Sequence, residues 1–150
     1  FLCVTMFPFS DVFEDFVSPV TAAQTLLHSS CKKRKDMLQK AMAMVTQVLT
    51  NPASEAPQKD GALHMVGSLA DVLLRKKVYR DQLDQLFIKY VYPEFSNERG
   101  HMRARACWVL HYFAEFPFRQ ENVLMEAVNL MVRALLHDTD LPVKVSGLSN

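Results

Sequence analysis

The feature that most constrains the fold is a short pattern that returns at nearly constant intervals. It is a basic residue followed three positions later by a small one, and it occurs as Lys59/Ala62, Arg103/Ala106 and Lys144/Gly147. The copies follow one another at nearly equal steps, and a similar step back from Ala62 reaches another small residue, Ala22. Such a period predicts similar units stacked on one another, with the small residue allowing neighbouring units to approach closely.

Apolar residues at spacings of three and four predict that each unit is a pair of helices. Ser18 and Pro19 provide an N-cap and a first-turn proline for the first helix. Pro93 should kink or end its helix, because proline lacks the N–H that a helix interior needs. No alternating polar and apolar stretch is long enough to predict a strand. The expected helices cover residues 20–30, 36–50, 58–75, 81–95, 101–116 and 120–137, with another opening at 141–145.

These helices predict an all-α fold. A hairpin period of about 40–47 residues is typical of HEAT or armadillo repeats. Each hairpin has two apolar faces that it cannot bury alone, so neighbours stack into a superhelix. We therefore expect a HEAT-repeat α-α superhelix of about three helical hairpins plus a truncated fourth. The alternative is an ordinary bundle of six helices.

Composition excludes several classes of function. The chain has only four glycines among 150 residues and no phosphate-binding glycine motif. A net charge of +1 provides no overall field for nucleic acid or an anionic membrane. Three widely spaced cysteines, Cys3, Cys31 and Cys107, cannot form a disulfide framework, which favours a reducing, intracellular environment.

No targeting or membrane segment is predicted. The longest apolar runs fall far short of the ~20 residues that span a bilayer. Residues 1–9 are hydrophobic but lack a starting Met and a basic region, so we expect no signal peptide. A chain that begins with Phe1 and stops at Asn150 is expected to be a piece of something longer.

One helix face carries residues with metal-ligand chemistry. Cys107, His111 and Glu115 follow one another at intervals of four and offer three potential ligands. The surrounding residues are apolar on nearly every side, which favours a buried, hydrogen-bonded histidine beside an unreactive core cysteine. We expect no metal, no cofactor and no catalytic residues, and metal analysis of the purified chain tests the alternative. Four aromatic residues at helical spacing are expected in the core: Trp108, Tyr112, Phe113 and Phe116.

Basic residues gather in three places. The run at 32–35 and the group at 75–80 are interpreted as solvated turns between helices rather than as nuclear localisation signals. Arg99, Arg103 and Arg105 lie near one helix start. We expect them to pair with carboxylates of the chain rather than with RNA phosphate, so nucleic acid is not an expected partner. The carboxylates considered are Asp71, Glu98 and Glu115.

Three long motifs point to a family. They are EDFVSPVTAAQTLL at 14–27, KDGALHMVGSLA at 59–70 and MRARACWVLHYF at 102–113. Occurring in this order, they closely resemble the importin-β (karyopherin-β) family, in particular the branch of importins seven and eight. The resemblance covers residues 11–145.

The resemblance implies a nuclear transport receptor found in nucleus and cytoplasm and at the nuclear pore. Such receptors are HEAT superhelices that bind protein cargo, cross the pore on phenylalanine-glycine nucleoporins and release import cargo when Ran-GTP binds. The family's principal Ran surface lies in N-terminal repeats, and the matching stretch resembles an interior segment beyond them. No Ran contact is therefore assigned to a residue of this chain.

The resemblance also divides the chain. Residues 1–10 are expected to be an N-terminal extension unlike the family, 11–145 an importin-like HEAT segment, and 146–150 a divergent C-terminal end. The rival function is a HEAT scaffold that assembles complexes without transport. Pull-downs of nucleoporin repeats and Ran-GTP with the full-length parent distinguish the two.

Overall fold

The computed structural model describes residues 18–148, and all regular secondary structure in that range is helical. The N-terminal extension expected at 1–10 and Cys3 lie outside the described residues. The elements, in chain order, are α2 (Pro19–Lys33), α3 (Lys35–Thr50), α4 (Ala56–Ser68), α5 (Ala70–Arg75), α6 (Lys77–Arg80), α7 (Leu83–Leu86), the π-helix η1 (Phe87–Val91), the 3-10 helix η2 (Tyr92–Ser96), α8 (Gly100–Tyr112), α9 (Glu121–His137) and α10 (Leu141–Leu148).

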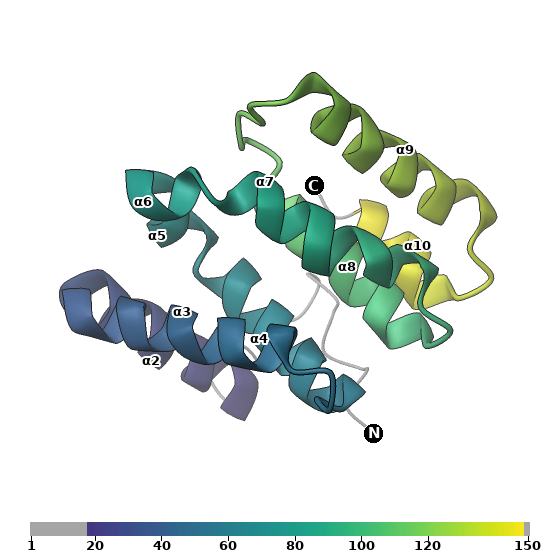
Figure 1. Cartoon of the computed structure of the whole chain (residues 1–150). Helices are drawn as coiled ribbons and strands as arrows, with labels where there is room; N and C mark the ends of the chain where they lie inside the picture. Colours follow the sequence, from purple (N-terminus) through teal and green to yellow (C-terminus); the bar gives the residue numbers. More distant parts are fainter. Residues whose placement is uncertain (1–17, 149–150) are drawn as a thin grey trace.

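The helices form two layers. Helices α2, α4, α8 and α10 pack one after another in chain order, as expected for the first helices of successive hairpins. The second elements α3, η2 and α9 pack against this row. Figure 1 shows the hairpins advancing from α2 and α3 at the lower left to α9 and α10 at the upper right. The expected all-α fold is confirmed for the described residues.

Aromatic rings fill the centre of the structure between α8 and η1. Phe87 is fully buried, with the rings of Phe113 and Phe118 at centroid distances of 5.2 and 5.5 Å. The expectation of a core position is correct for Phe113 and Phe116. It is wrong for Tyr112, whose side chain is exposed, and only partly right for Trp108, which is half-buried between helices.

The expected single helix over residues 58–75 is broken at Leu69. The side-chain hydroxyl of Ser68 donates to the carbonyl of His64, four residues earlier, at 2.8 Å. This kind of bond competes with the backbone ladder and bends helices. Leu69 then has φ −102° and ψ 9°, outside the helical region, and α5 begins at the next residue.

The second helix of this pair is also irregular. The prediction of a continuous α-helix over 81–95 is wrong, although the expected disturbance at Pro93 is confirmed. Proline offers no N–H to the preceding turn. The chain opens into the π-turn η1 and then tightens into η2, with Pro93 in the first turn of η2.

Two helix boundaries also differ from expectation. Helix α8 ends at Tyr112, four residues before the expected end, and turns lead from it to Pro117. Helix α10 continues to Leu148, beyond Val145, where the family resemblance was expected to end. Among residues 18–148, no helix combines the length and apolarity needed to cross a bilayer.

Candidate functional site

The best-organised polar contacts join the first helices of successive hairpins, and Arg103 on α8 is the first of them. Its guanidinium donates from Nε and Nη2 to the two carboxylate oxygens of Asp138, at 2.7 and 2.9 Å, and from Nη2 to Asp140 at 2.7 Å. Its Nη1 donates to the backbone carbonyls of Asn97 and Glu98. One side chain therefore holds the start of α10 and the loop before α8 in place.

These bonds favour the charged form of the acid. The hydrogen bond from Arg103 lowers the pKa of Asp138 from its ordinary value, and burial opposes the shift. Only 9% of the Asp138 side chain is exposed, so the pair is shielded from solvent. Gly100 allows this arrangement, because a Cβ there would collide with the Asp140 carboxylate.

Arg105 forms the corresponding link back to α4. Its Nε donates to Asp60 at 2.7 Å, and its guanidinium lies 4.9 Å from the centre of the Trp108 ring. The Trp108 ring packs over Gly67, where an added Cβ would lie 2.9 Å from ring atom Cε3 and closer still to Cζ3. The glycine therefore sets how closely α4 and α8 approach.

The link between α2 and α4 is made by hydrogen bonds. Gln24 Nε2 donates to His64 Nε2 at 2.5 Å and to Ser68 Oγ at 3.1 Å. Burial, followed by the nearby charge of Arg105, lowers the pKa of His64 to about 4. The imidazole is therefore neutral at pH 7 and accepts the bond from Gln24.

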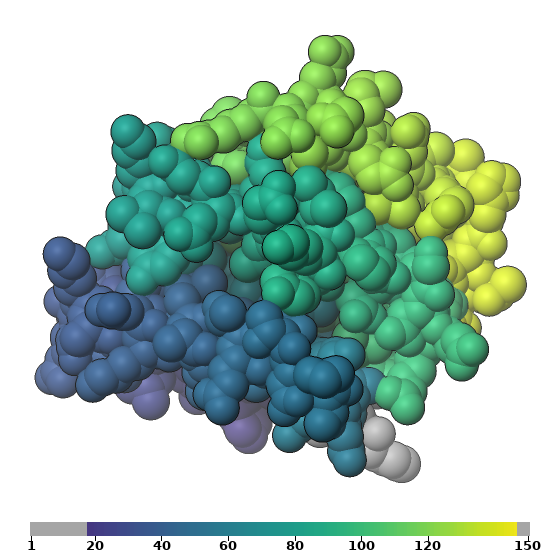
Figure 2. Space-filling model, viewed as in Figure 1, coloured from purple at the N-terminus to yellow at the C-terminus, as the bar shows by residue number. Residues whose placement is uncertain are grey.

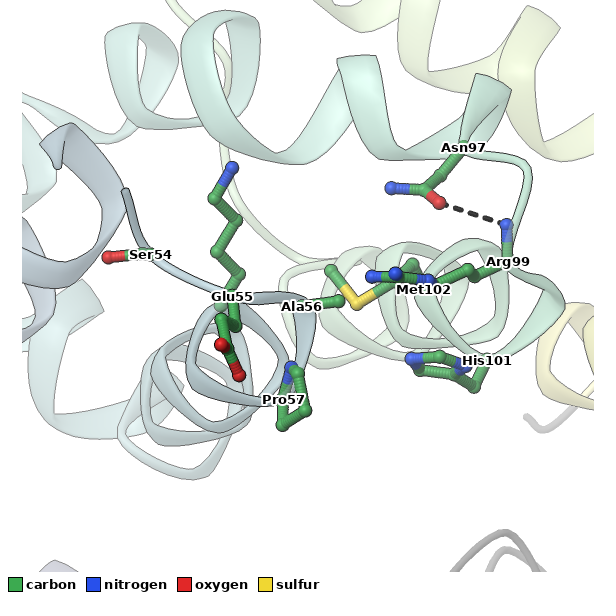
Figure 3. A pocket seen from close by; sticks show the side chains of 9 residues that line it. Ser54, Glu55, Ala56, Pro57, Asn97, Arg99, His101 and Met102 are labelled. Carbon is green, nitrogen blue, oxygen red and sulfur yellow. Dashed lines mark hydrogen bonds between the residues drawn. The ribbon is translucent and has the colours of Figure 1, made fainter. Parts of the chain in front are cut away.

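A groove lies between the starts of α4 and α8, and Figure 3 shows its lining. Its volume is about 630 Å³. Asn97 fixes one wall, accepting a bond from the backbone N–H of Arg99 at 2.9 Å and donating to Glu94 at 2.6 Å. The lining residues are Ser54, Glu55, Ala56, Pro57, Lys59, Asn97, Arg99, His101 and Met102.

Charged and polar side chains line much of the groove. Glu55 and Gln58 form a reciprocal capping box at the start of α4, so the Glu55 carboxylate is held by the backbone. The side chains of Lys59 and Arg99 have no ion pair or hydrogen bond within residues 18–148. Rigid walls and two available cations allow reversible, non-covalent binding.

The structure corrects three of the expectations for reactive and charged residues. His111 is half-buried and contacts the Tyr112 ring edge-on at 5.4 Å, so the expectation of a buried, hydrogen-bonded histidine is wrong. Arg103 and Arg105 do pair internally, but with Asp138, Asp140 and Asp60 rather than with the carboxylates considered from the sequence. The expected pairing of Arg99 is not seen in the part of the chain that the structure describes.

The two cysteines within residues 18–148 are core residues. Cys107 is completely buried, and burial raises the pKa of its thiol to about 12. Burial also raises the pKa of Cys31. Within residues 18–148, no three His, Cys, Asp or Glu side chains gather closely enough to hold a metal ion. Cys107, His111 and Glu115 are accordingly not brought together as ligands.

The acids that complete the polar contacts were missed from the sequence. Asp60 is separated from Arg105 by 45 residues and Asp138 from Arg103 by 35. The available signal was the repeat itself, since an acid one period away from an arginine is a candidate partner on the next hairpin.

Comparison with known proteins identifies close relatives. The chain is 47% identical over 137 residues to importin-8 of Mus musculus, covering 91% of this chain and 14% of that protein. Importin-8 of Homo sapiens is also 47% identical over 137 residues, covering 91% of this chain and 13% of that protein. The importin beta-like SAD2 homolog of Arabidopsis thaliana is 32% identical over 145 residues, covering 92% of this chain and 14% of that protein.

The chain therefore spans about a seventh of the length of the curated relatives it matches. Neither a family model nor a solved structure matches it.

Proposed function

Because the chain belongs to the importin-β family, in the branch of importins seven and eight, we propose that it forms part of a nuclear transport receptor. In this proposal residues 11–145 are an interior HEAT-repeat segment, and residues 1–10 and 146–150 are extensions that differ from the family. The receptor would carry protein cargo between cytoplasm and nucleus under the control of Ran-GTP. Its function is protein binding, without catalysis.

The identity to importin-8 over 91% of the chain carries this proposal. The way the first helices are joined supports it. Bonds from Arg105 to Asp60 and from Arg103 to Asp138 connect α4 to α8 and α8 to the start of α10. Ion pairs that join one hairpin to the next in this way are typical of a solenoid, in which each unit packs on its neighbour.

The mechanism we propose is reversible binding on a flexible scaffold. The walls of the groove between the starts of α4 and α8 belong to successive hairpins, so a change in superhelical curvature alters its width. Cargo or nucleoporin segments that contact Lys59 and Arg99 would thus be bound or released as the receptor bends. Ran-GTP would act mainly through N-terminal repeats outside this segment.

A segment exchange tests the proposal. The part of human importin-8 that matches this chain is replaced by the corresponding residues of the chain, and the hybrid is assayed for binding to phenylalanine-glycine nucleoporin repeats and to Ran-GTP. Binding of both at the level of native importin-8 is expected. Because the hybrid keeps the N-terminal repeats of importin-8, Ran-GTP binding shows that it is folded, and loss of nucleoporin-repeat binding by such a hybrid would contradict the transport proposal.

The matched control tests whether the stacking of hairpins matters. In the hybrid, Arg105→Asp places like charges opposite each other across α4 and α8, and adding Asp60→Arg restores a pair of opposite sign. We expect the single change to weaken binding and the double change to recover it. The alternative, a HEAT scaffold without transport activity, predicts a folded hybrid that binds protein partners and, through its own N-terminal repeats, Ran-GTP, but not nucleoporin repeats.

A further inference from the structure

Two basic runs that are far apart in the sequence, at 32–35 and 75–80, lie at the same edge of the structure. His28 on α2 donates to Asp71 on α5 at 2.8 Å, which places the two helices in contact. With α2 and α5 running in the same direction at this contact, Lys32 and Arg75, each one turn further along its helix, are expected at the same level. Figures 1 and 2 show the α2–α3 turn and the α5–α6 segment adjoining at the left of the molecule.

Eight cations make up this basic edge, and all but the half-buried Lys76 are exposed. The nearby acids are already engaged: Asp36 pairs with Lys40, Asp71 with His28 and Arg75, and Asp81 with Arg119. Arg75 is 3.9 Å from Asp71, and the other seven cations form no ion pair with the described residues. The members of the edge are Lys32, Lys33, Arg34, Lys35, Arg75, Lys76, Lys77 and Arg80.

Helix electrostatics explains only part of this charge. Lys32 and Lys33 lie in the last turn of α2, where a cation is favourable. Arg34, however, occupies the N-cap position of α3 without a capping bond, and Lys35 is the first residue of that helix. An acid or a small polar residue would stabilise this helix start, whereas cations oppose its dipole. Cations placed at such a cost in stability indicate a role outside the fold.

We propose that this basic edge is a docking surface for an acidic segment of another protein. Val78, with 70% of its surface exposed, lies among the cations and offers an apolar contact to such a segment. The only aromatic residue within the two runs, Tyr79, is half-buried and provides no open ring for base stacking. These features favour a peptide over a nucleic acid.

Fluorescence anisotropy on the purified chain tests the proposal. The probe is a labelled peptide with repeats of Glu-Glu-Glu-Leu, compared with the same peptide carrying Gln in place of Glu. We expect the acidic peptide to bind, its affinity to fall as salt is raised, and the neutral peptide not to bind. Absence of binding by the acidic peptide at low salt would overturn the proposal.

Charge reversals locate the surface. Lys32→Glu/Lys33→Glu and Lys76→Glu/Lys77→Glu should each weaken binding by about tenfold, because an exposed ion pair contributes up to about fivefold and two are lost. The control Lys89→Glu/Arg133→Glu changes the net charge equally at exposed positions outside the edge and should bind as the unmodified chain does. Equal weakening by the control would overturn the proposed location.

Arg34→Asp separates binding from folding. It supplies an N-cap acid to α3, so the unfolding temperature should rise while the affinity for the acidic peptide falls. If these cations had a purely structural role, Arg34→Asp would not raise the unfolding temperature while lowering the affinity for the acidic peptide. Oligouridine and phosphatidylserine vesicles are tested in parallel. Tighter binding of either than of the acidic peptide would overturn the assignment to a protein partner.

Discussion

Gly67 provides the sharpest test of how α4 and α8 pack. In Gly67→Ala the new methyl group would lie 2.9 Å from Trp108 Cε3 and closer still to Cζ3, so the indole must move. The ring would then lose its edge contact with His64, now at 4.9 Å, and its position under Arg105.

The magnitude follows from opposing effects. Alanine is favoured over glycine inside a helix by about 1 kcal/mol. Overpacking costs about 1–3 kcal/mol, and the displaced aromatic and cation–π contacts are together worth about 1–2 kcal/mol. We expect Gly67→Ala to lower the free energy of unfolding by about 1–4 kcal/mol.

Gly61 is the matched control, because it lies in the same helix and a Cβ there meets nothing within 4 Å. Gly61→Ala should raise the free energy of unfolding by about 0.5–1 kcal/mol. The two variants should therefore differ by roughly 3–20 °C in unfolding temperature, followed by far-UV circular dichroism.

A double-mutant cycle completes this test. In a Trp108→Ala background the clash is removed, so Gly67→Ala should become stabilising, as Gly61→Ala is. If Gly67→Ala stabilises the chain with Trp108 in place, the proposed close approach of α4 and α8 is wrong.

The remaining predictions concern charges and thiols. Arg103→Ala should lower the free energy of unfolding by about 2–3 kcal/mol, because it leaves the shielded Asp138 carboxylate without its partner; a loss below about 0.5 kcal/mol in urea unfolding would contradict this. Because the pKa of Asp138 is lower in the folded chain, the pair stabilises the fold at pH values above the ordinary aspartate pKa of 3.8, and this stability is lost as the pH falls through the folded pKa. Urea unfolding midpoints should therefore fall at acid pH in the native chain and fall less in Arg103→Ala. The pKa of His64 is lower in the folded chain, so the unfolded state binds the proton more readily and the free energy of unfolding should fall as the pH drops from 6.5 to about 4. His64→Gln should make the free energy of unfolding less dependent on pH in this range, and an unchanged dependence would refute the neutral imidazole. Cys31 and Cys107 should react with iodoacetamide only when the chain unfolds, because both thiols are buried with raised pKa values; rapid labelling of either under native conditions would contradict the burial.

Helical periodicity and capping were sufficient to predict where most helices lie. Helix α9 spans Glu121–His137 and was expected at 120–137, because its apolar residues recur regularly and its flanking residues are polar. The break at Leu69 was not predictable, since it depends on the rotamer with which Ser68 bonds to the carbonyl of His64. The periodicity of a single sequence does not indicate which rotamer a side chain adopts.

The sequence predicted that arginines form internal ion pairs, but it did not predict which acids they pair with. The expectation that Arg103 pairs with a carboxylate of the chain is correct, but the identity of its partners, Asp138 and Asp140, depends on how far α8 and α10 are offset. The basic edge was missed because each of its runs, taken alone, is an ordinary exposed turn. Only the contact of α2 with α5 brings them to one surface.

Nuclear import by the importin-8 hybrid that carries this chain's residues tests whether the chain forms part of a working transport receptor. The assay measures nuclear accumulation of an importin-8 cargo in permeabilised cells supplied with the hybrid, Ran and an energy source. We expect accumulation comparable to that with native importin-8, loss of it with Arg105→Asp, and recovery when Asp60→Arg is added. A well-folded hybrid that binds cargo yet leaves it outside the nucleus would contradict the assignment to a transport receptor.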